Sequence, residues 1–127
     1  MVQVLFSIIL ALFTTYAFSS SWNCRNHDLE IRCNSSKCET SNGFTPFDIS
    51  INISGALSIC AYSGCWKGKG KVMKSGNHFL ISGTKLKWAD TNTGTANFIV
   101  AVDTRDKVGF VKGEGFAMPT TCTQQTK

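Results

Sequence analysis

Polar and apolar residues alternate along much of the chain after its first twenty-one residues. The cleanest alternation covers residues 47–54, where Phe47, Ile49 and Ile51 share one side with Ile53, and polar residues occupy the other. Successive side chains of a β-strand point to opposite faces of its sheet, so this pattern predicts a half-buried strand. A shorter alternation at residues 28–33 predicts another, with Leu29 and Ile31 on its apolar face.

Glycine, asparagine and serine divide the rest of the chain into short segments. Most of these segments carry the composition or the alternation of strands, and no sustained helical period follows the first twenty-one residues. We expect the further strands at residues 56–62, 66–74, 78–82, 85–89, 97–103 and 108–118. Residues 97–103 lack alternation, which predicts burial on both faces. The pattern as a whole predicts an all-β fold, a single small antiparallel barrel or sandwich of about eight short strands.

The first eighteen residues carry no charged side chain and contain an apolar run at 4–13. This is the pattern of a secretory signal peptide, because the run has the length of a signal core and is shorter than a membrane span. We assign residues 1–21 to the signal, with cleavage after about residues 17–21 and retention as an anchor left open. Residues 22–122 then form one β-domain and 123–127 a polar tail. The expected location is secreted or periplasmic.

All six cysteines follow the signal, which in an exported protein predicts disulfides. Six cysteines allow fifteen pairings, and spacing does not select one of them. Our working pairing joins neighbours twice and the two outermost cysteines once: Cys33 with Cys38, Cys60 with Cys65, and Cys24 with Cys122. A metal site on the two Cys-x4-Cys spacings is the competing interpretation. Export and the absence of nearby histidines disfavour it, and we expect no cofactor.

Charge is concentrated in residues 60–88. The protein has 13 basic and 8 acidic residues and a net charge of +5. Six of the lysines lie in this stretch, which contains no acid. Five of them fall at alternate positions of two predicted strands: Lys67, Lys69, Lys71, Lys85 and Lys87. If these strands share a sheet, the lysines form a cationic surface for a polymer, surface or protein bearing phosphate, sulfate or carboxylate groups.

The alternative interpretation of these lysines is a solvated face that discourages pairing at a sheet edge. Trp66 and Trp88 alternate away from the lysines, so we expect both in the core rather than as stacking platforms. No nucleic-acid motif accompanies the basic residues. Oligomeric state does not follow from the pattern.

Catalytic signatures are absent from the sequence. His27 and His78 are far apart in the chain and are expected to be surface or packed residues. Asp103 and Asp106 flank a predicted turn and are expected to form it. The Ser-Gly dipeptides are turns rather than nucleophile elbows. We therefore expect a non-enzymatic binding protein. The alternatives are a structural protein of the envelope and a hydrolase whose site assembles only in three dimensions.

Three segments carry a resemblance to known proteins. They are residues 60–66 (CAYSGCW), residues 44–48 (FTPFD) and the closing Cys122. With them, the chain resembles small secreted or periplasmic six-cysteine proteins of bacteria that have no assigned function. The resemblance implies a periplasmic location and supplies no catalytic residue. Ser63 and Gly64 also resemble the Ser-Gly loop of periplasmic lysozyme inhibitors, which implies an enzyme inhibitor as an alternative function.

Overall fold

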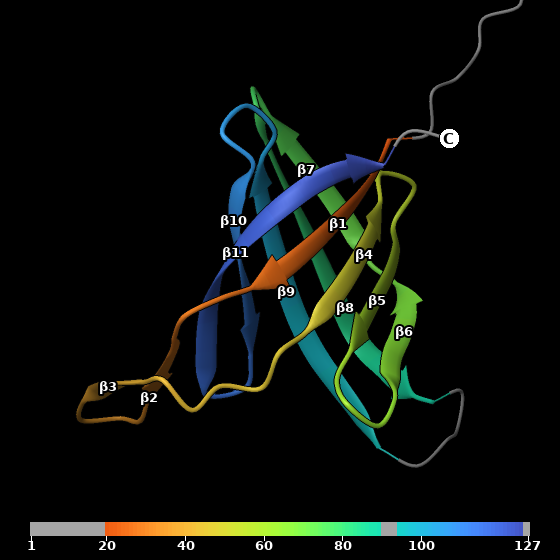
Figure 1. The fold of residues 1–127 in the computed structure, drawn as a ribbon. Coiled ribbons are helices and arrows are strands. Elements are labelled where there is room, and N and C mark those ends of the chain that lie inside the picture. The colour runs from red at the N-terminus through yellow and green to blue at the C-terminus, as the bar shows by residue number, and fades with distance from the viewer. Residues whose placement is uncertain (1–19, 90–93, 126–127) are drawn as a thin grey trace, which may run out of the picture.

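The computed structural model describes residues 20–89 and 94–125, which form eleven strands and no helix (Figure 1). The strands are β1 (Ser21–Asn26), β2 (Glu30–Cys33), β3 (Cys38–Ser41), β4 (Asp48–Asn52), β5 (Ala56–Cys60), β6 (Cys65–Lys69), β7 (Lys71–Ser75), β8 (His78–Trp88), β9 (Thr95–Asp103), β10 (Val108–Gly113) and β11 (Phe116–Gln125). All pairings are antiparallel. The all-β prediction is confirmed.

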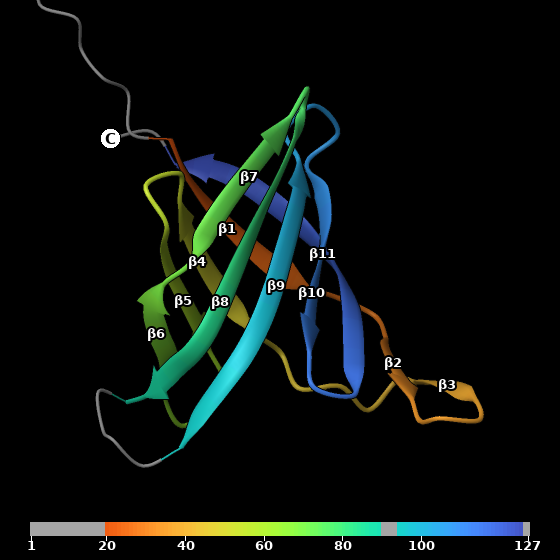
Figure 2. The same ribbon diagram turned by 180° about the vertical axis from the view of Figure 1, so that it is seen from behind.

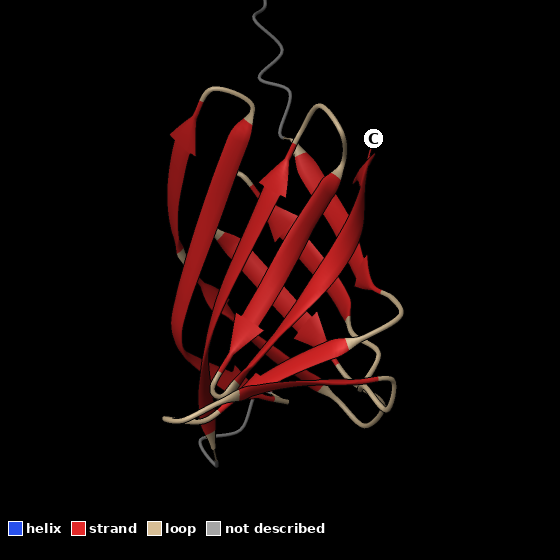
Figure 3. Cartoon of the chain, turned by 90° about the vertical axis from the view of Figure 1, so that its left-hand side faces the viewer, coloured by secondary structure: helices blue, strands red, loops and turns tan. Residues whose placement is uncertain are grey.

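Pairing of β1 with β11 closes the sheet into a barrel, seen from the side in Figure 3. The order around the barrel is β1, β4, β5, β6, β8, β9, β10 and β11. Strand β7 follows β6 in the chain and pairs with the first part of β8. Strand β2 pairs with the first two residues of β11, Phe116 and Ala117. The hairpin of β2 and β3 projects away from the barrel as an arm (Figure 1). The barrel form is therefore the correct one of the two architectures predicted.

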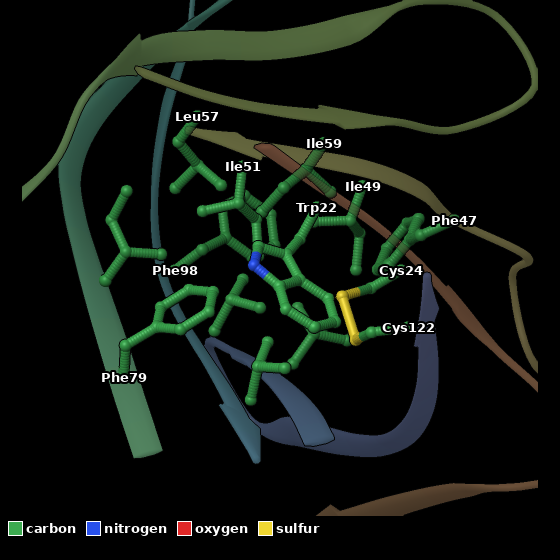
Figure 4. Close-up of a cluster of buried hydrophobic side chains, with 14 of the residues drawn as sticks. Trp22, Cys24, Phe47, Ile49, Ile51, Leu57, Ile59, Phe79, Phe98 and Cys122 are labelled. Carbon is green, nitrogen blue, oxygen red and sulfur yellow. A yellow bond between two sulfur atoms is a disulfide. The ribbon is translucent and has the colours of Figure 1, made fainter. Parts of the chain in front are cut away.

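The interior of the barrel is filled mainly by apolar side chains from alternate positions of the strands. Buried residues include Ile49, Ile59, Ile81 and Val100, each with no exposed surface. Figure 4 shows Trp22 between Phe79 and a disulfide at the centre of this cluster. The alternation predicted at residues 47–54 is confirmed for Phe47, Ile49 and Ile51, which belong to the core, whereas Ile53 lies beyond the end of β4 and is only partly buried.

The three disulfides join Cys24 to Cys122, Cys33 to Cys38, and Cys60 to Cys65, so the working pairing is confirmed. Each joins residues directly opposite each other on neighbouring strands. The metal interpretation of the cysteines is thereby wrong, since all six thiols are consumed.

The predicted turn between residues 82 and 85 is wrong. Strand β8 runs without a break from His78 to Trp88 and carries only a shift of register between Gly83 and Leu86. Lys85 has a positive φ of 53° there, and its backbone amide donates to Asn97 Oδ1 at 2.8 Å. The Gly83-Thr84 pair therefore makes a bulge in the strand instead of reversing the chain.

The strand predicted at residues 66–74 is divided at Gly70 into β6 and β7. The Gly70 amide donates to Gly55 O, and a Cβ atom at residue 70 would lie 2.8 Å from Ser82 O. Only glycine allows this close approach of three chain segments. Residues 108–118 likewise divide into β10 and β11, at a turn that contains Gly115 with φ 77°.

Two predicted burial patterns are wrong. In β2 the alternation is inverted, because Glu30 is buried and Ile31 is exposed. Asp28 adopts a left-handed φ of 73° just before the strand and turns the chain, which rotates the face that β2 presents. Strand β9 is buried on its inner face only, through Phe98, Val100 and Val102, since its other face is the outside of a barrel.

The predictions for the two ends of the chain have different outcomes in the structure. The expected signal sequence falls mainly on residues 1–19, which lie outside the described residues. Strand β11 runs to Gln125, so residues 123–125, which the sequence assigns to the polar tail, pair with β1. Within residues 20–89 and 94–125, no helix is long and apolar enough to cross a membrane.

Candidate functional site

The two lysine-bearing segments lie side by side in one sheet. Trp66 pairs with Trp88 and Lys67 with Lys87 across β6 and β8, and Lys71 on β7 pairs with Ser82 (Figure 2). The five predicted site residues, Lys67, Lys69, Lys71, Lys85 and Lys87, are all exposed. The structure therefore brings them together on the outside of the barrel. We call this set the lysine face.

Neutral residues border the lysine face. One row of cross-strand partners runs from Ser50 to Ser58, Lys67, Lys87 and Thr95, over strands β4 to β9. Lys69 stands opposite Ala56 on β5. In the described part of the chain, the ion pairs lie elsewhere: Arg25 with Asp48, Arg32 with Glu30, Lys37 with Glu39, and His78 with Asp103. The ammonium groups of the lysine face thus have no acid partner among these residues.

The direct pairing of Lys67 with Lys87 is electrostatically unfavourable. Residues directly opposite each other in an antiparallel pair have Cβ atoms roughly 5 Å apart, and like charges at such positions repel. An anion placed between the two ammonium groups reverses the sign of this interaction, because it attracts both. Neighbouring hydroxyls of Ser58 and Thr95 offer further hydrogen-bond donors on the same row.

An open groove of about 330 Å³ adjoins the lysine face. Its lining includes Ser50, Ala56, Ser58 and Gly68, which have small side chains or none, so the surface of β4 to β6 is hollow at this place. Lys67 is the member of the lysine face that also lines this groove, so the groove and the lysine face meet at that residue.

The tryptophans face the opposite way from the lysines, as predicted. Trp66 packs against the core and its ring lies 4.4 Å from that of Trp88 and 5.3 Å from that of Phe98, measured between centroids. The expectation that both tryptophans lie in the core is met only in part, because both are half-buried and Trp88 reaches the core cluster through its contact with Trp66.

The two histidines occupy separate surfaces, as expected. His27 Nε2 lies 3.0 Å from Thr121 Oγ1 and lines an open pocket of about 560 Å³ with Phe44, Asp48 and Tyr62 among others. His78 Nε2 lies 3.2 Å from Asp103 Oδ2 and lines a different pocket. The residues described contain no group of three or more side chains suited to hold a metal ion.

Asp103 and Asp106 form the turn between β9 and β10, as predicted. Asp103 Oδ1 accepts from the amides of Arg105 and Asp106, and Asp106 Oδ1 accepts from that of Val108. The Arg105 amide is the main reason that the pKa of Asp103 lies below its ordinary value of 3.8. Burial opposes this effect, while the Asp106 amide and the charges of His78 and Arg105 add to it.

A pKa lowered by folding makes the ionised carboxylate a source of stability above pH 3.8, and this stability is lost as the pH falls through the folded-state pKa. In Asp103→Asn the charge is removed and the acceptor oxygen is kept. We expect the variant to be less stable than the wild type near pH 7, with the difference shrinking at about pH 2.5. Urea unfolding at both pH values measures it. A difference independent of pH would contradict the role given to the charge.

Two features of the structure could not be predicted from the sequence pattern. The first is the buried Glu30, hidden by the inverted register of β2. The second is an apolar row on the outside of the barrel, in which cross-strand partners follow one another over five strands: Met73, Leu80, Ala101, Phe110 and Pro119. Met73 and Phe110 are 53% and 42% exposed. The unbroken apolar run in residues 97–103 is the one sequence signal that points to this outer row.

Comparison of the chain with protein-family models, with curated proteins and with solved structures finds no match.

Proposed function

We propose that this protein is a non-enzymatic binding protein that holds an anionic polymer on the lysine face of β6, β7 and β8. The observation that supports this most is the direct pairing of Lys67 with Lys87, since two like charges are kept opposite each other at a cost in stability. Lys69, Lys71 and Lys85 extend the same charge along the barrel. The groove beside Lys67 gives a polymer chain a place to lie.

A polymer suits this surface better than a single anion. Exposed charge pairs contribute roughly 0–1 kcal/mol each, so one small anion gains little from lysines in open solvent. Outward positions along one strand recur roughly every 7 Å, and cross-strand positions are closer. A chain with repeated phosphate, sulfate or carboxylate groups engages several lysines at once and adds their contributions.

The proposed place of action is the periplasm or the outside of the cell. Three disulfides are consistent with an oxidising compartment. Anionic polymers of the cell envelope and its surroundings are the class of partner that the lysine face would meet there. The polymer contact requires no chemistry on the ligand, and the proposal includes none.

Retention on an anionic column at increasing salt tests the proposal. We expect the variant with Lys67, Lys69, Lys71, Lys85 and Lys87 changed to Ser to elute at a much lower salt concentration than the wild type, because the multivalent contact is lost. The matched control removes five positive charges elsewhere, through Arg25→Gln, Lys37→Ser, Arg105→Gln, Lys107→Ser and Lys112→Ser. It is expected to shift far less. Equal shifts for the two variants would show that net charge alone governs retention and would overturn the proposal.

A further inference from the structure

A small cavity lies where β2 meets the end of the barrel. It has a volume of about 150 Å³, and its lining includes Glu30, Arg32, Phe47, Trp66, Phe116 and Met118. These residues come from strands β2, β6 and β11 and from the chain entering β4, so the cavity forms only in the closed barrel. It is separate from the lysine face, whose side chains point outward from the same end of β6.

The carboxylate of Glu30 is the polar group of this cavity. The side chain is only 4% exposed. Its Oε1 atom forms an ion pair with Arg32 Nε but accepts no hydrogen bond, because the contact lacks hydrogen-bond geometry. Buried carboxylates ordinarily receive hydrogen bonds from charged or amide donors, since their desolvation is costly. Glu30 therefore has a nearby positive charge while its hydrogen-bonding capacity stays unused.

Aromatic rings line the same cavity as this carboxylate. The ring centroid of Phe47 lies 6.3 Å from that of Trp66 and 6.0 Å from that of Phe116. The face of an aromatic ring carries negative potential and attracts cations. Arg32 already shows this attraction, because its guanidinium carbon lies 5.8 Å from the centroid of Phe116. Carboxylate and rings together make a site of negative potential lined mostly by carbon.

We infer that this cavity binds a small organic cation of the alkylammonium class, and that Arg32 occupies its entrance in the free protein. A cavity of about 150 Å³ has room for a group of roughly six heavy atoms. Metal ions such as Ca²⁺ require several oxygen ligands, which the aromatic walls do not supply. A methylated ammonium group instead matches both elements of the site, the rings around its methyl groups and the carboxylate beside its charge.

Arg32 can leave the cavity when another cation takes its place. Its side chain is 65% exposed, so rotation into solvent disturbs no buried packing, but by itself it would leave the buried Glu30 carboxylate without a partner, which is costly. An incoming cation removes this cost, because it supplies the positive charge that departs. Arg32 is thus an internal competitor for the site, and its removal is expected to strengthen binding.

Calorimetric titration with choline tests this inference, with tryptophan fluorescence of the wild type as a second readout because Trp66 lines the cavity. The neutral molecule 3,3-dimethylbutan-1-ol has the same shape as choline and serves as the control ligand. We expect choline to bind and the neutral isostere to bind at least tenfold more weakly. Arg32→Ala is expected to bind choline about fivefold more tightly. Glu30→Gln is expected to lose at least tenfold in affinity.

Glu39→Gln is the matched control variant, because Glu39 is an exposed carboxylate of the same arm, paired with Lys37. It should bind choline as the wild type does. Arg32→Ala changes only an exposed side chain, so it keeps the test decisive even if Glu30→Gln folds poorly. Equal affinity for choline and the neutral isostere would overturn the inference, as would a failure of Arg32→Ala to bind choline at all.

Discussion

Removal of the Cys24–Cys122 disulfide is expected to lower the free energy of unfolding by about 4.7 kcal/mol. The bridge spans 98 residues and therefore restricts nearly the whole unfolded domain, and the loop-entropy model gives this value for a loop of about 100 residues. Both cysteines are buried and face each other across β1 and β11, the strand pair that closes the barrel. The double variant Cys24→Ala/Cys122→Ala, unfolded in urea and followed by tryptophan fluorescence, measures the loss.

The matched control is the disulfide of the arm. Cys33 and Cys38 are five residues apart and exposed, so the same model gives only about 2 kcal/mol for Cys33→Ala/Cys38→Ala. The closing disulfide should therefore be the more important of the two by about 2.5 kcal/mol. Equal losses would show that loop length does not control the stability of this protein.

Trp22→Ala is expected to cost about 3–5 kcal/mol of unfolding free energy, the range for removal of a large aromatic side chain from a core. Trp22 is 5% exposed, its ring centroid lies 6.2 Å from that of Phe79, and it occupies the centre of the buried cluster (Figure 4). Its replacement leaves a void that surrounding β-strands, tied by the closing disulfide, are poorly able to collapse.

Tyr62→Ala provides the comparison for this variant. Tyr62 is 82% exposed on the loop bridged by Cys60 and Cys65, so its truncation should change stability by less than about 0.5 kcal/mol. Thermal unfolding followed by circular dichroism ranks the two variants. A Trp22→Ala protein as stable as Tyr62→Ala would mean that the barrel repacks around the missing indole.

The sequence predicts those features of the fold that depend on local alternation. Strand β4 is identified by the alternating apolar residues in and beside it, and the separation of Lys67 from Trp66 on opposite faces follows from the same period. Disulfide chemistry is predicted from the expected signal sequence and the even number of cysteines. The first two conclusions use residues that are neighbours in the chain, and all three agree with the structure.

The errors arise where a distant segment decides the outcome. Gly83 and Thr84 have the composition of a turn, yet Asn97 on β9 captures the Lys85 amide and keeps β8 continuous. The alternation in β2 is strong but inverted, because Asp28 rotates the chain and β11 presents the barrel end to Glu30. Closure of the barrel also decides which side of β9 is inside. Asp28 adjoins β2 in the chain, but Asn97, β11 and the strands that close the barrel are distant in sequence from the residues they affect.

The two candidate sites differ in the same way, because one is built from neighbouring residues and the other from distant segments. The lysine face could be predicted, because its members alternate within two predicted strands. The structure adds that the first of these divides into β6 and β7 and that both pair with β8. The cavity at Glu30 could not be predicted, since its walls come from four separate parts of the chain. A single acidic residue between two apolar ones gave no sign of burial in the sequence.

The projecting arm and the barrel are expected to differ in how cooperatively they unfold. Strands β2 and β3 are joined to the barrel through only two paired positions on β11, whereas every barrel strand has partners on both sides. The arm keeps its own hairpin through Cys33 and Cys38 and so can detach as an intact piece. Partial opening of this kind leaves the barrel folded. Because Glu30 and Arg32 belong to the arm and line the aromatic cavity, we expect the same opening to dismantle that cavity, so a cation bound there should hold the arm against the barrel.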